Sequence, residues 1–449
     1  MSLRVVLGMT ALLCGTTLLA HAEDWPQFRG PGGSAVTRET DLPSEWGADK
    51  NIHWKIAVPG VAWSSPVVVG DRVIVTTAIT DNQKKPRPFG GGMGGKGPGG
   101  FGKGGKAPDV LYRWEVHCLD RATGKTLWKS SAIEKKPAIP THSTNTYASE
   151  TPACDGERIY AYFGMTGLYC FDLEGKKLWQ KDLGVYSMMN SWGTGSSPVV
   201  AGELVFVQCD NEDKSFLIAL DRKTGKEIWK KDRPDRSAWA TPLVWKNKVR
   251  TEIVCLSSRR ARSYEPATGE MLWELTLTGR GNSSASPVGD EEQIYFGNGG
   301  PFGSTPLYAV KAGAKGDITP KTGETTGEFI AWSNSKGAPT MASPLLYEGR
   351  LYVFDQRSGF VTCVDAKSGK QNYRERLPQA RGITSSPWAY EGKVFCTDED
   401  GRTFVIQAGP EFKLLGTNKL DEMFWSSPAV AGGNLFLRGT EHLFCIKSR

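Results

Sequence analysis

The chain has 449 residues, of which 39% are hydrophobic and 23% are charged, a composition typical of folded globular proteins rather than disordered ones. Its formal net charge is +7, but six lysines and arginines fall between residues 84 and 106 with no acid among them, and Arg4 lies in a predicted signal segment. The remainder is close to neutral, which argues against a nucleic-acid-binding surface.

Residues 1–22 have the pattern of a secretory signal, with an apolar core and Ala20-His21-Ala22 as a small-residue cleavage site. A lipid anchor at Cys14 is the alternative, but Leu13 stands where a small residue is expected. No later apolar run reaches the roughly 18–20 residues needed to cross a bilayer. We therefore expect an exported protein, periplasmic or secreted, without a transmembrane segment.

After a lead-in at residues 23–50, one pattern recurs eight times: a small or hydroxyl residue, a proline, and a short apolar run. The prolines are Pro66, Pro152, Pro198, Pro242, Pro287, Pro344, Pro387 and Pro428. Most are spaced by about 44 residues, and a turn such as Asp221–Trp229 (D-R-K-T-G-K-E-I-W) follows each of several copies. Short strands repeated at this period are typical of β-propeller blades.

The fold class predicted is all-β, an eight-bladed propeller of four-stranded antiparallel blades over residues 51–449. The eighth repeat stops one strand short, while residues 51–58 form an unassigned strand before the first repeat. We expect this N-terminal strand to complete the last blade and close the ring, which removes open sheet edges. Residues 84–108 are low in complexity and rich in Gly and Lys, which predicts a disordered loop.

The cysteines of the predicted mature chain number eight, but the repeat argues against disulfides. Cys118, Cys170, Cys363 and Cys445 occupy the same repeat position, where Ala219 stands in another copy. A position shared with alanine is small and buried, and equivalent positions of separate blades are unlikely to be neighbours. The sequence predicts buried free thiols.

Candidate functional residues lie in the segments that join the last strand of one blade (D) to the first strand of the next (A). These D–A segments share one end of the ring with the B–C loops, and the two longest, before Pro152 and before Pro198, are where we expect function. The candidates at the channel mouth are Glu150, Asn190, Trp192, Trp239, Asn282, Arg381 and Trp425. Tryptophans near the mouth either bind a ligand or fill the channel. The acidic run 398–400 could ligate Ca²⁺, but its place between two strands favours a solvated turn. No catalytic residues are predicted.

The repeats resemble those of the pyrroloquinoline-quinone (PQQ)-like propellers, in A-x-D-x-x-T-G-K-x-x-W and the preceding S-x-P-V-V. The start D-W-P-Q-F-R-G-P, from Asp24 to Pro31, is similar to that of many exported members. The resemblance implies that tryptophans dock each blade on its neighbour, here Trp54, Trp128, Trp179, Trp229, Trp273 and Trp332. Tyr373 and Leu414 depart from this pattern.

The resembled family divides by function. Its quinoprotein dehydrogenases hold PQQ and Ca²⁺ in the channel, and many have an adjacent cysteine pair that this chain lacks. Its other branch is similar to an outer-membrane assembly scaffold without a cofactor. We expect an exported, non-catalytic binding or scaffolding protein of the cell envelope, monomeric, without cofactor or metal, whose partner is an envelope protein or a small ligand in the axial channel. The alternative is a PQQ- and Ca²⁺-dependent oxidoreductase.

Overall fold

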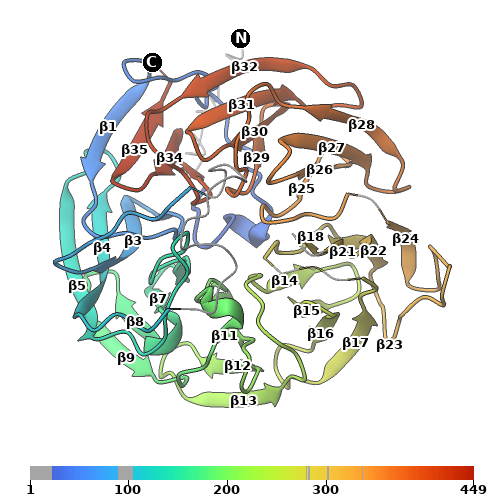
Figure 1. Cartoon of the computed structure of the whole chain (residues 1–449), viewed down its shortest axis with the longest axis horizontal. Helices are drawn as coiled ribbons and strands as arrows, with labels where there is room; N and C mark the ends of the chain where they lie inside the picture. The colour runs from blue at the N-terminus through green and yellow to red at the C-terminus, as the bar shows by residue number, and fades with distance from the viewer. Residues whose placement is uncertain are drawn as a thin grey trace, which may run out of the picture.

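The computed structural model describes residues 23–88, 105–279, 281, 284–300, 303–335 and 337–448. Eight antiparallel sheets surround a central axis as the blades of a ring (Figure 1). The predicted signal segment, Cys14 and most of the predicted disordered loop lie outside the described residues. In that described part of the chain, no helix has the length and apolar character needed to cross a membrane.

Within each blade the strands are lettered A to D from the channel to the rim. Blades 1 and 2 contain β2 (Val67–Val69), β3 (Arg72–Ile79), β4 (Tyr112–Asp120), β5 (Thr126–Lys135), then β6 (Ala153–Cys154), β7 (Arg158–Tyr162), β8 (Leu168–Asp172) and β9 (Lys177–Lys181). Blades 3 and 4 contain β10 (Val199–Ala201), β11 (Leu204–Cys209), β12 (Phe216–Asp221), β13 (Glu227–Asp232), then β14 (Leu243–Lys246), β15 (Thr251–Leu256), β16 (Arg260–Tyr264) and β17 (Met271–Thr276).

The second half of the ring repeats this order. Blades 5 and 6 contain β18 (Val288–Gly289), β19 (Gln293–Phe296), β22 (Leu307–Lys311), β24 (Ile330–Asn334), then β25 (Leu345–Tyr347), β26 (Arg350–Phe354), β27 (Phe360–Asp365) and β28 (Gln371–Arg376). Blades 7 and 8 contain β29 (Trp388–Tyr390), β30 (Lys393–Thr397), β31 (Arg402–Gln407), β32 (Leu414–Lys419), then β33 (Ala429–Ala431), β34 (Asn434–Arg438), β35 (His442–Lys447) and β1 (Ile52–Ala57).

Two additions complete the set of elements. In blade 5, β20 (Gly299–Gly300) and β21 (Gly303–Ser304) form a small hairpin, and β23 (Gly316–Asp317) lies parallel to β17 as a fifth strand of blade 4. Three short 3₁₀ turns are η1 (Pro31–Gly33), η2 (Gly164–Thr166) and η3 (Met189–Ser191).

The N-terminal strand closes the ring, as predicted. β1 pairs antiparallel with β35, with Trp54 opposite Cys445 and Lys55 opposite Phe444. Because β1 is the outer strand of the last blade, the two ends of the chain share one sheet. The prediction of eight blades closed by this strand is confirmed.

Turns of the T-G type set the register between strands C and D. In blade 3, Asp221 Oδ1 accepts hydrogen bonds from the Thr224 N–H at 2.8 Å and from the Thr224 hydroxyl at 2.7 Å. Gly225 has φ of 69°, and a Cβ there would lie 2.6 Å from the Trp179 ring of blade 2. The turn therefore needs glycine both for its backbone conformation and for the room that the neighbouring indole occupies.

Tryptophans near the rim connect successive blades. In five of them the indole Nε1 donates to a carbonyl in the C–D turn of the next blade, at 2.8–3.2 Å: Trp54 to Arg121, Trp128 to Leu173, Trp179 to Arg222, Trp229 to Pro266, and Trp332 to Ala366. Trp273 differs, since it donates to Glu252 of its own blade at 2.7 Å and stacks on Phe296 of blade 5. In blade 5 the connection between β22 and β24 is the long segment 312–329, in place of the short turn that offers the carbonyl in the five blades above.

A closed ring of hydrogen bonds surrounds the channel and explains the hydroxyl residue before each proline. The N–H of each such residue donates to the side-chain hydroxyl of its counterpart in the next blade, at 2.9–3.1 Å. The last residue donates back to the first. We call this set the hydroxyl ring: Ser65, Thr151, Ser197, Thr241, Ser286, Ser343, Ser386 and Ser427.

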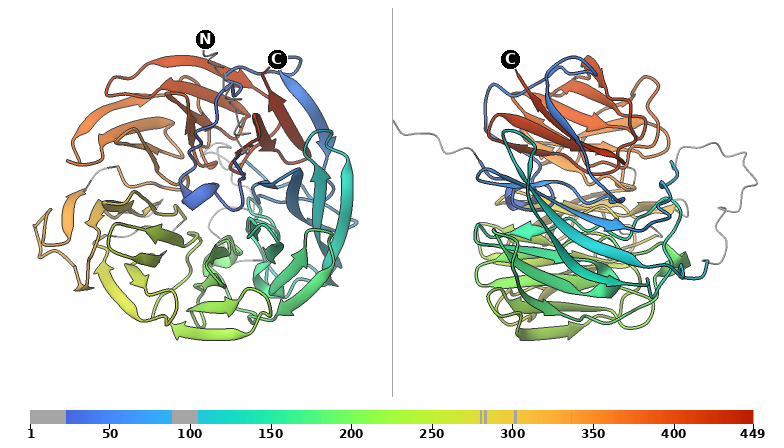
Figure 2. Two further views of the ribbon diagram at one scale, coloured as in Figure 1. Left: turned by 180° about the vertical axis from the view of Figure 1, so that it is seen from behind. Right: turned by 90° about the vertical axis from the view of Figure 1, so that its left-hand side faces the viewer.

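Residues 23–50, the N-terminal segment, cross the channel at the end that carries the A–B turns (Figures 1 and 2). The Pro26 carbonyl accepts the Cys154 N–H of blade 2 at 2.7 Å, and the Arg29 guanidinium reaches the Pro344 carbonyl of blade 6 at 2.6 Å. Blades 2 and 6 are opposite in a ring of eight, so the chain between these residues passes over the axis. Trp25 of this segment is fully buried, and its backbone forms two hydrogen bonds with Val68 of blade 1.

The eight described cysteines are free, as expected from the repeat. Seven are buried and Cys209 is half-buried. Four of them, Cys118, Cys170, Cys363 and Cys445, share one position, where each lies opposite the docking residue of the outer strand of its blade. A small buried side chain at this position has a structural role.

Candidate functional site

The two long D–A segments lie side by side at the channel mouth. The Asn145 side-chain amide donates to the Trp192 carbonyl at 2.7 Å and to the Thr194 carbonyl at 3.2 Å. Gly193 sits so close to Thr141 that a Cβ would meet the Thr141 hydroxyl at 2.3 Å. These contacts fasten the segment before Pro152 to the segment before Pro198 and so build one continuous wall.

A pocket opens between blades 2 and 3 against this wall, with about 380 Å³ of empty space, open solvent included. It is bordered by side chains of both blades and of the second long segment, including Tyr162, Tyr186, Thr194, Gln208, Cys209 and Asp210. The Gln208 amide donates to the Leu256 carbonyl and to Asp210, while its Oε1 has no hydrogen-bond partner among the described residues. Gln208 therefore has one buried acceptor that the described residues leave unsatisfied.

Glu150 is buried next to this pocket. The residue two positions before the proline is Ala or Ser in seven repeats and Glu only in blade 2. The Glu150 carboxyl accepts a hydrogen bond from the Thr194 hydroxyl, but its Oε1 has no hydrogen-bond partner among the described residues. Burial raises the pKa of this carboxyl to about 7, against an ordinary value of 4.5. Burial therefore favours the protonated form of this carboxyl.

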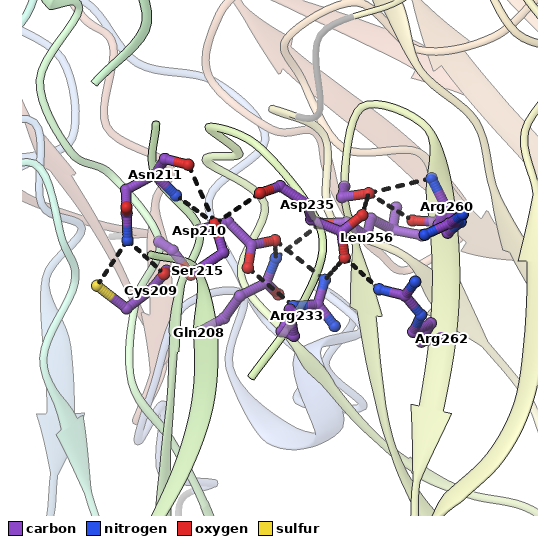
Figure 3. Close-up of polar contacts among 12 residues, drawn as sticks. Gln208, Cys209, Asp210, Asn211, Ser215, Arg233, Asp235, Leu256, Arg260 and Arg262 are labelled. Carbon is purple, nitrogen blue, oxygen red and sulfur yellow. Dashed lines mark hydrogen bonds and ion pairs between the residues drawn. The ribbon is translucent and has the colours of Figure 1, made fainter. Parts of the chain in front are cut away.

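A buried charge network borders the other side of the pocket (Figure 3). The Arg233 guanidinium, fully buried, bonds both oxygens of Asp210, with Nε at 2.8 Å and Nη2 at 3.0 Å, and its Nη1 donates to the Tyr264 hydroxyl at 2.8 Å. Burial raises the pKa of Asp210, and the Arg233 charge opposes that shift. This planar two-bond pairing holds the end of β11 against the segment that follows β13.

The network continues into blade 4. Asp235 lies 3.3 Å from Arg233, accepts the Ser257 hydroxyl at 2.7 Å, and forms an ion pair with Arg262. Arg262 bonds Glu274 at 2.9 Å through its Nε. Positive and negative side chains thus alternate from blade 3 into blade 4, and the guanidiniums of Arg233 and Arg262 each pair with carboxylates. The network therefore joins these two blades beneath the channel mouth.

Tryptophans cover the mouth in two pairs. Trp63 and Trp425 stack with ring centroids 5.2 Å apart, and Trp192 packs on Trp239 at 5.4 Å. The indoles of Trp63 and Trp239 donate to carbonyls of the long segments, Thr144 at 2.8 Å and Gly193 at 2.7 Å. Trp192, Trp239 and Trp425 remain half-buried, so each offers part of its surface to solvent.

The structure brings only some of the predicted residues together. Trp192 and Trp239 are in contact, and Glu150 lies at the same wall, whereas Asn190 is exposed on η3. Arg381 is exposed beside blade 7, where its N–H bonds Asp398 at 3.1 Å. Asn282 lies outside the described residues.

The expectation of a solvated turn at 398–400 is wrong for its first two residues. Asp398 and Glu399 are buried, and Asp398 accepts the backbone N–H groups of Arg381 and Arg402. The carboxylate orders this turn by satisfying backbone donors that a small loop cannot pair with itself.

Sequence reasoning missed Gln208, Asp210, Arg233 and Asp235. The sequence analysis did not single them out, although Q-C-D-N at 208–211 ends an otherwise apolar strand and was a usable signal. Within the described part of the chain, no three His, Cys, Asp or Glu side chains are grouped so as to hold a metal ion.

Glu150 gives a testable pH dependence. Because its folded pKa lies above the ordinary value, the protonated form favours folding, and this contribution is complete below about 4.5 and lost as pH rises through about 7. We expect the contribution to reach roughly 3 kcal/mol, since one pKa unit corresponds to about 1.4 kcal/mol. Glu150→Gln should therefore remove much of the fall in unfolding free energy between these pH values, measured by urea denaturation.

The matched control is Glu157→Gln, at an exposed carboxylate that pairs with Arg158 on the surface of the same blade. It should leave the pH profile of the wild type nearly unchanged. Identical profiles for the wild type and Glu150→Gln would contradict the assignment.

Solved structures with similar folds include both functional branches. BamB from Moraxella catarrhalis matches with a TM-score of 0.54 at 10% identity, over 83% of this chain and 97% of that one. A europium-containing methanol dehydrogenase matches at 0.58 and 10% identity, over 94% and 90%. The quinohemoprotein alcohol dehydrogenase from Comamonas testosteroni matches at 0.54 and 11% identity, over 94% and 80%. At such identities these likenesses establish the fold alone.

Among curated protein sequences, none matches this chain significantly. A family model, described as outer membrane protein assembly factor BamB, matches residues 113–306 and 314–409, which is more than half of the chain. The repeats and the closed ring agree with that match along its whole length. The chain therefore belongs to the family of PQQ-repeat propellers that this model describes, outer membrane protein assembly factor BamB.

Proposed function

We propose that this chain is a non-catalytic binding and scaffolding protein of the cell envelope, which receives its partner at the end of the ring formed by the D–A segments. Family membership supports an envelope location and a protein partner, because the family's described member is an outer-membrane assembly factor. The signal pattern of residues 1–22 supports export.

The observation that carries the proposal is the half-buried Trp192–Trp239 pair beside the pocket. The Trp239 indole is held by its hydrogen bond to the Gly193 carbonyl, and Trp192 packs on it. Val185 and Asn190 are exposed on the same long segment as Trp192. Rigid, partly exposed tryptophans beside a recess are the residues that most often dominate protein interfaces. The opposite end of the channel is crossed by the N-terminal segment, which leaves the D–A end as the accessible one.

We also propose that the channel works without PQQ or Ca²⁺. Ca²⁺ takes six to eight oxygen ligands, preferably charged carboxylates. Glu150, the predicted carboxylate at the mouth, is buried and accepts a hydrogen bond from the Thr194 hydroxyl. Trp63 is buried and stacks on Trp425, so one face of each of these indoles is already covered.

Titration of the purified mature protein with PQQ and Ca²⁺ tests this proposal. We expect no saturable quenching of tryptophan fluorescence and no dye-linked oxidation of alcohols or sugars. Saturable quenching with turnover would instead establish the quinoprotein alternative. Trp239→Phe, compared with Trp179→Phe at the rim, would then tell whether the quencher sits at the mouth or elsewhere.

A further inference from the structure

The first two residues after the predicted cleavage site are held in place by hydrogen bonds. The Glu23 N–H donates to Glu39 Oε1 at 2.8 Å, and the Thr37 hydroxyl donates to Glu23 Oε2 at 2.7 Å. Asp24 Oδ1 accepts the Gly70 N–H at 2.8 Å, in the A–B turn of blade 1. The N-terminal segment is therefore fastened from residue 23 onward.

Glu39 connects this end of the segment to blade 8. Its Oε1 accepts the Gly432 N–H and its Oε2 accepts the Gly433 N–H, both at 2.8 Å, in the A–B turn between β33 and β34. Both glycines have positive φ, 60° and 72°, and their successive N–H groups converge on the one carboxylate. With the Glu23 N–H, three backbone donors surround this half-buried side chain.

The Glu39 carboxylate lacks a cationic side chain as a partner. Within the described ranges, no lysine or arginine forms an ion pair with it. Arg121 lies against the same turn, where a Cβ on Gly432 would be 2.2 Å from its Nη1, but this guanidinium pairs with Asp71 at 3.0 Å. A carboxylate is bound about twice as strongly by a charged donor as by a neutral one. The Glu23 nitrogen is the donor that can become charged.

Cleavage after Ala22 produces that charge. Hydrolysis of the Ala22–Glu23 peptide bond by an envelope endopeptidase consumes one water, leaves a carboxylate on Ala22, and turns the Glu23 nitrogen into an α-amine that is mostly protonated at neutral pH. We propose that this new α-ammonium forms an ion pair with Glu39, so that removal of the signal locks the N-terminal segment onto blade 8. The proposal rests on the export proposed above, and the ion pair lies at the opposite end of the ring from the partner surface.

The lock makes closure of the A–B end depend on processing. An uncleaved chain keeps a neutral amide at Glu23, so its hydrogen bond to Glu39 carries no charge from the donor. A cleaved chain has the same nitrogen in the same place with a positive charge. Processing is thus a local electrostatic change that biases the N-terminal segment toward its docked state.

Hydrogen exchange at two backbone groups of the ring reports how often the segment detaches. The Val68 N–H donates to the Trp25 carbonyl at 2.9 Å, and the Cys154 N–H donates to the Pro26 carbonyl at 2.7 Å. Both groups lose their acceptors when the segment leaves, so their exchange rates follow the opening equilibrium. Mass spectrometry of the peptides that contain them measures these rates at pH 7.

Two forms of the mature chain test the ion pair: residues 23–449 with a free N-terminus at Glu23, and the same chain with Gly-Ser added before Glu23. The extension keeps the net charge but moves the ammonium away from Glu39. We expect it to speed exchange about fivefold, the scale of a partly exposed ion pair. In Glu39→Gln the extension should have almost no further effect, since the pair is already lost.

Glu45→Gln is the matched control, because Glu45 lies in the same segment, is exposed, and pairs with Lys50. The extension should speed exchange in this variant as much as in the wild type. An extension without effect, or one with equal effects in the Glu39 and Glu39→Gln chains, would overturn the proposal. If Glu39→Gln does not fold, the comparison of the free and extended wild-type chains decides.

The mass of the processed protein separates this proposal from the proposed function. Expressed with its own signal and isolated from the cell envelope, the chain should have the mass of residues 23–449. A different first residue would overturn the lock and leave the partner surface at the D–A end untouched. Conversely, failure to find a partner at that end would not change the exchange rates measured here.

Discussion

Arg233→Met is expected to lower the free energy of unfolding by roughly 3–5 kcal/mol, because it leaves the buried carboxylates of Asp210 and Asp235 without their shared cation. Both carboxylates are almost fully buried, so water cannot replace the guanidinium. Urea denaturation at pH 7 measures the change. The deficit should shrink as pH falls, since removal of the cation raises the folded pKa of Asp210 further and protonation then relieves the unpaired charge.

Arg236→Met is the matched control, three residues further along the same segment. Arg236 pairs with Glu212, but its side chain is 76% exposed, and such surface pairs contribute roughly 0–1 kcal/mol. The network interpretation fails if the two variants lose similar stability. It also fails if Arg233→Met destabilises the protein equally at pH 4 and pH 7.

Trp25→Ala is expected to cost roughly 3–5 kcal/mol of unfolding free energy, since it empties the space of a fully buried indole. Trp25 packs in the core cluster that includes residues of blades 6, 7 and 8, and its backbone pairs with Val68 of blade 1 at 2.8 and 2.9 Å. The loss of unfolding free energy in Trp25→Ala therefore measures how much the packing of the N-terminal segment stabilises the ring. Urea denaturation of the mature protein gives the value.

Trp192→Ala provides the comparison at the opposite end of the channel. Its indole is half-buried and packs mainly on Trp239, so the loss should be clearly smaller than for Trp25→Ala. A Trp25→Ala variant as stable as the wild type would mean that the N-terminal segment is detached from the ring in solution.

The repeat made the blades predictable because its signals are local. A proline that starts each inner strand and a glycine turn before several of the outer strands act within a few residues, and both are repeated. The path of the N-terminal segment was not predictable, because its contacts join residues far apart in the chain, such as Arg29 and Pro344. The segment has no repeat of its own to reveal a partner.

The site was predictable in location but not in chemistry. The two longest D–A segments do border the pocket, since insertions at one end of a ring gather around the channel. The charge network was missed because Asp210, Arg233 and Arg262 come from three strands or segments, and a single charge at a strand end normally faces water. Only the packing of blade 3 on blade 4 buries them together.

Site-specific photo-crosslinking in the native cell envelope tests the proposed function most directly. A benzophenone amino acid at Asn190, exposed beside the Trp192–Trp239 pair, should give one discrete adduct, which Trp192→Ala and Trp239→Ala should weaken. The same probe at Lys223, exposed in a C–D turn at the other end of the ring, should not give that adduct. The absence of an adduct at Asn190, or the same adduct from Lys223, would contradict a partner surface at the D–A end.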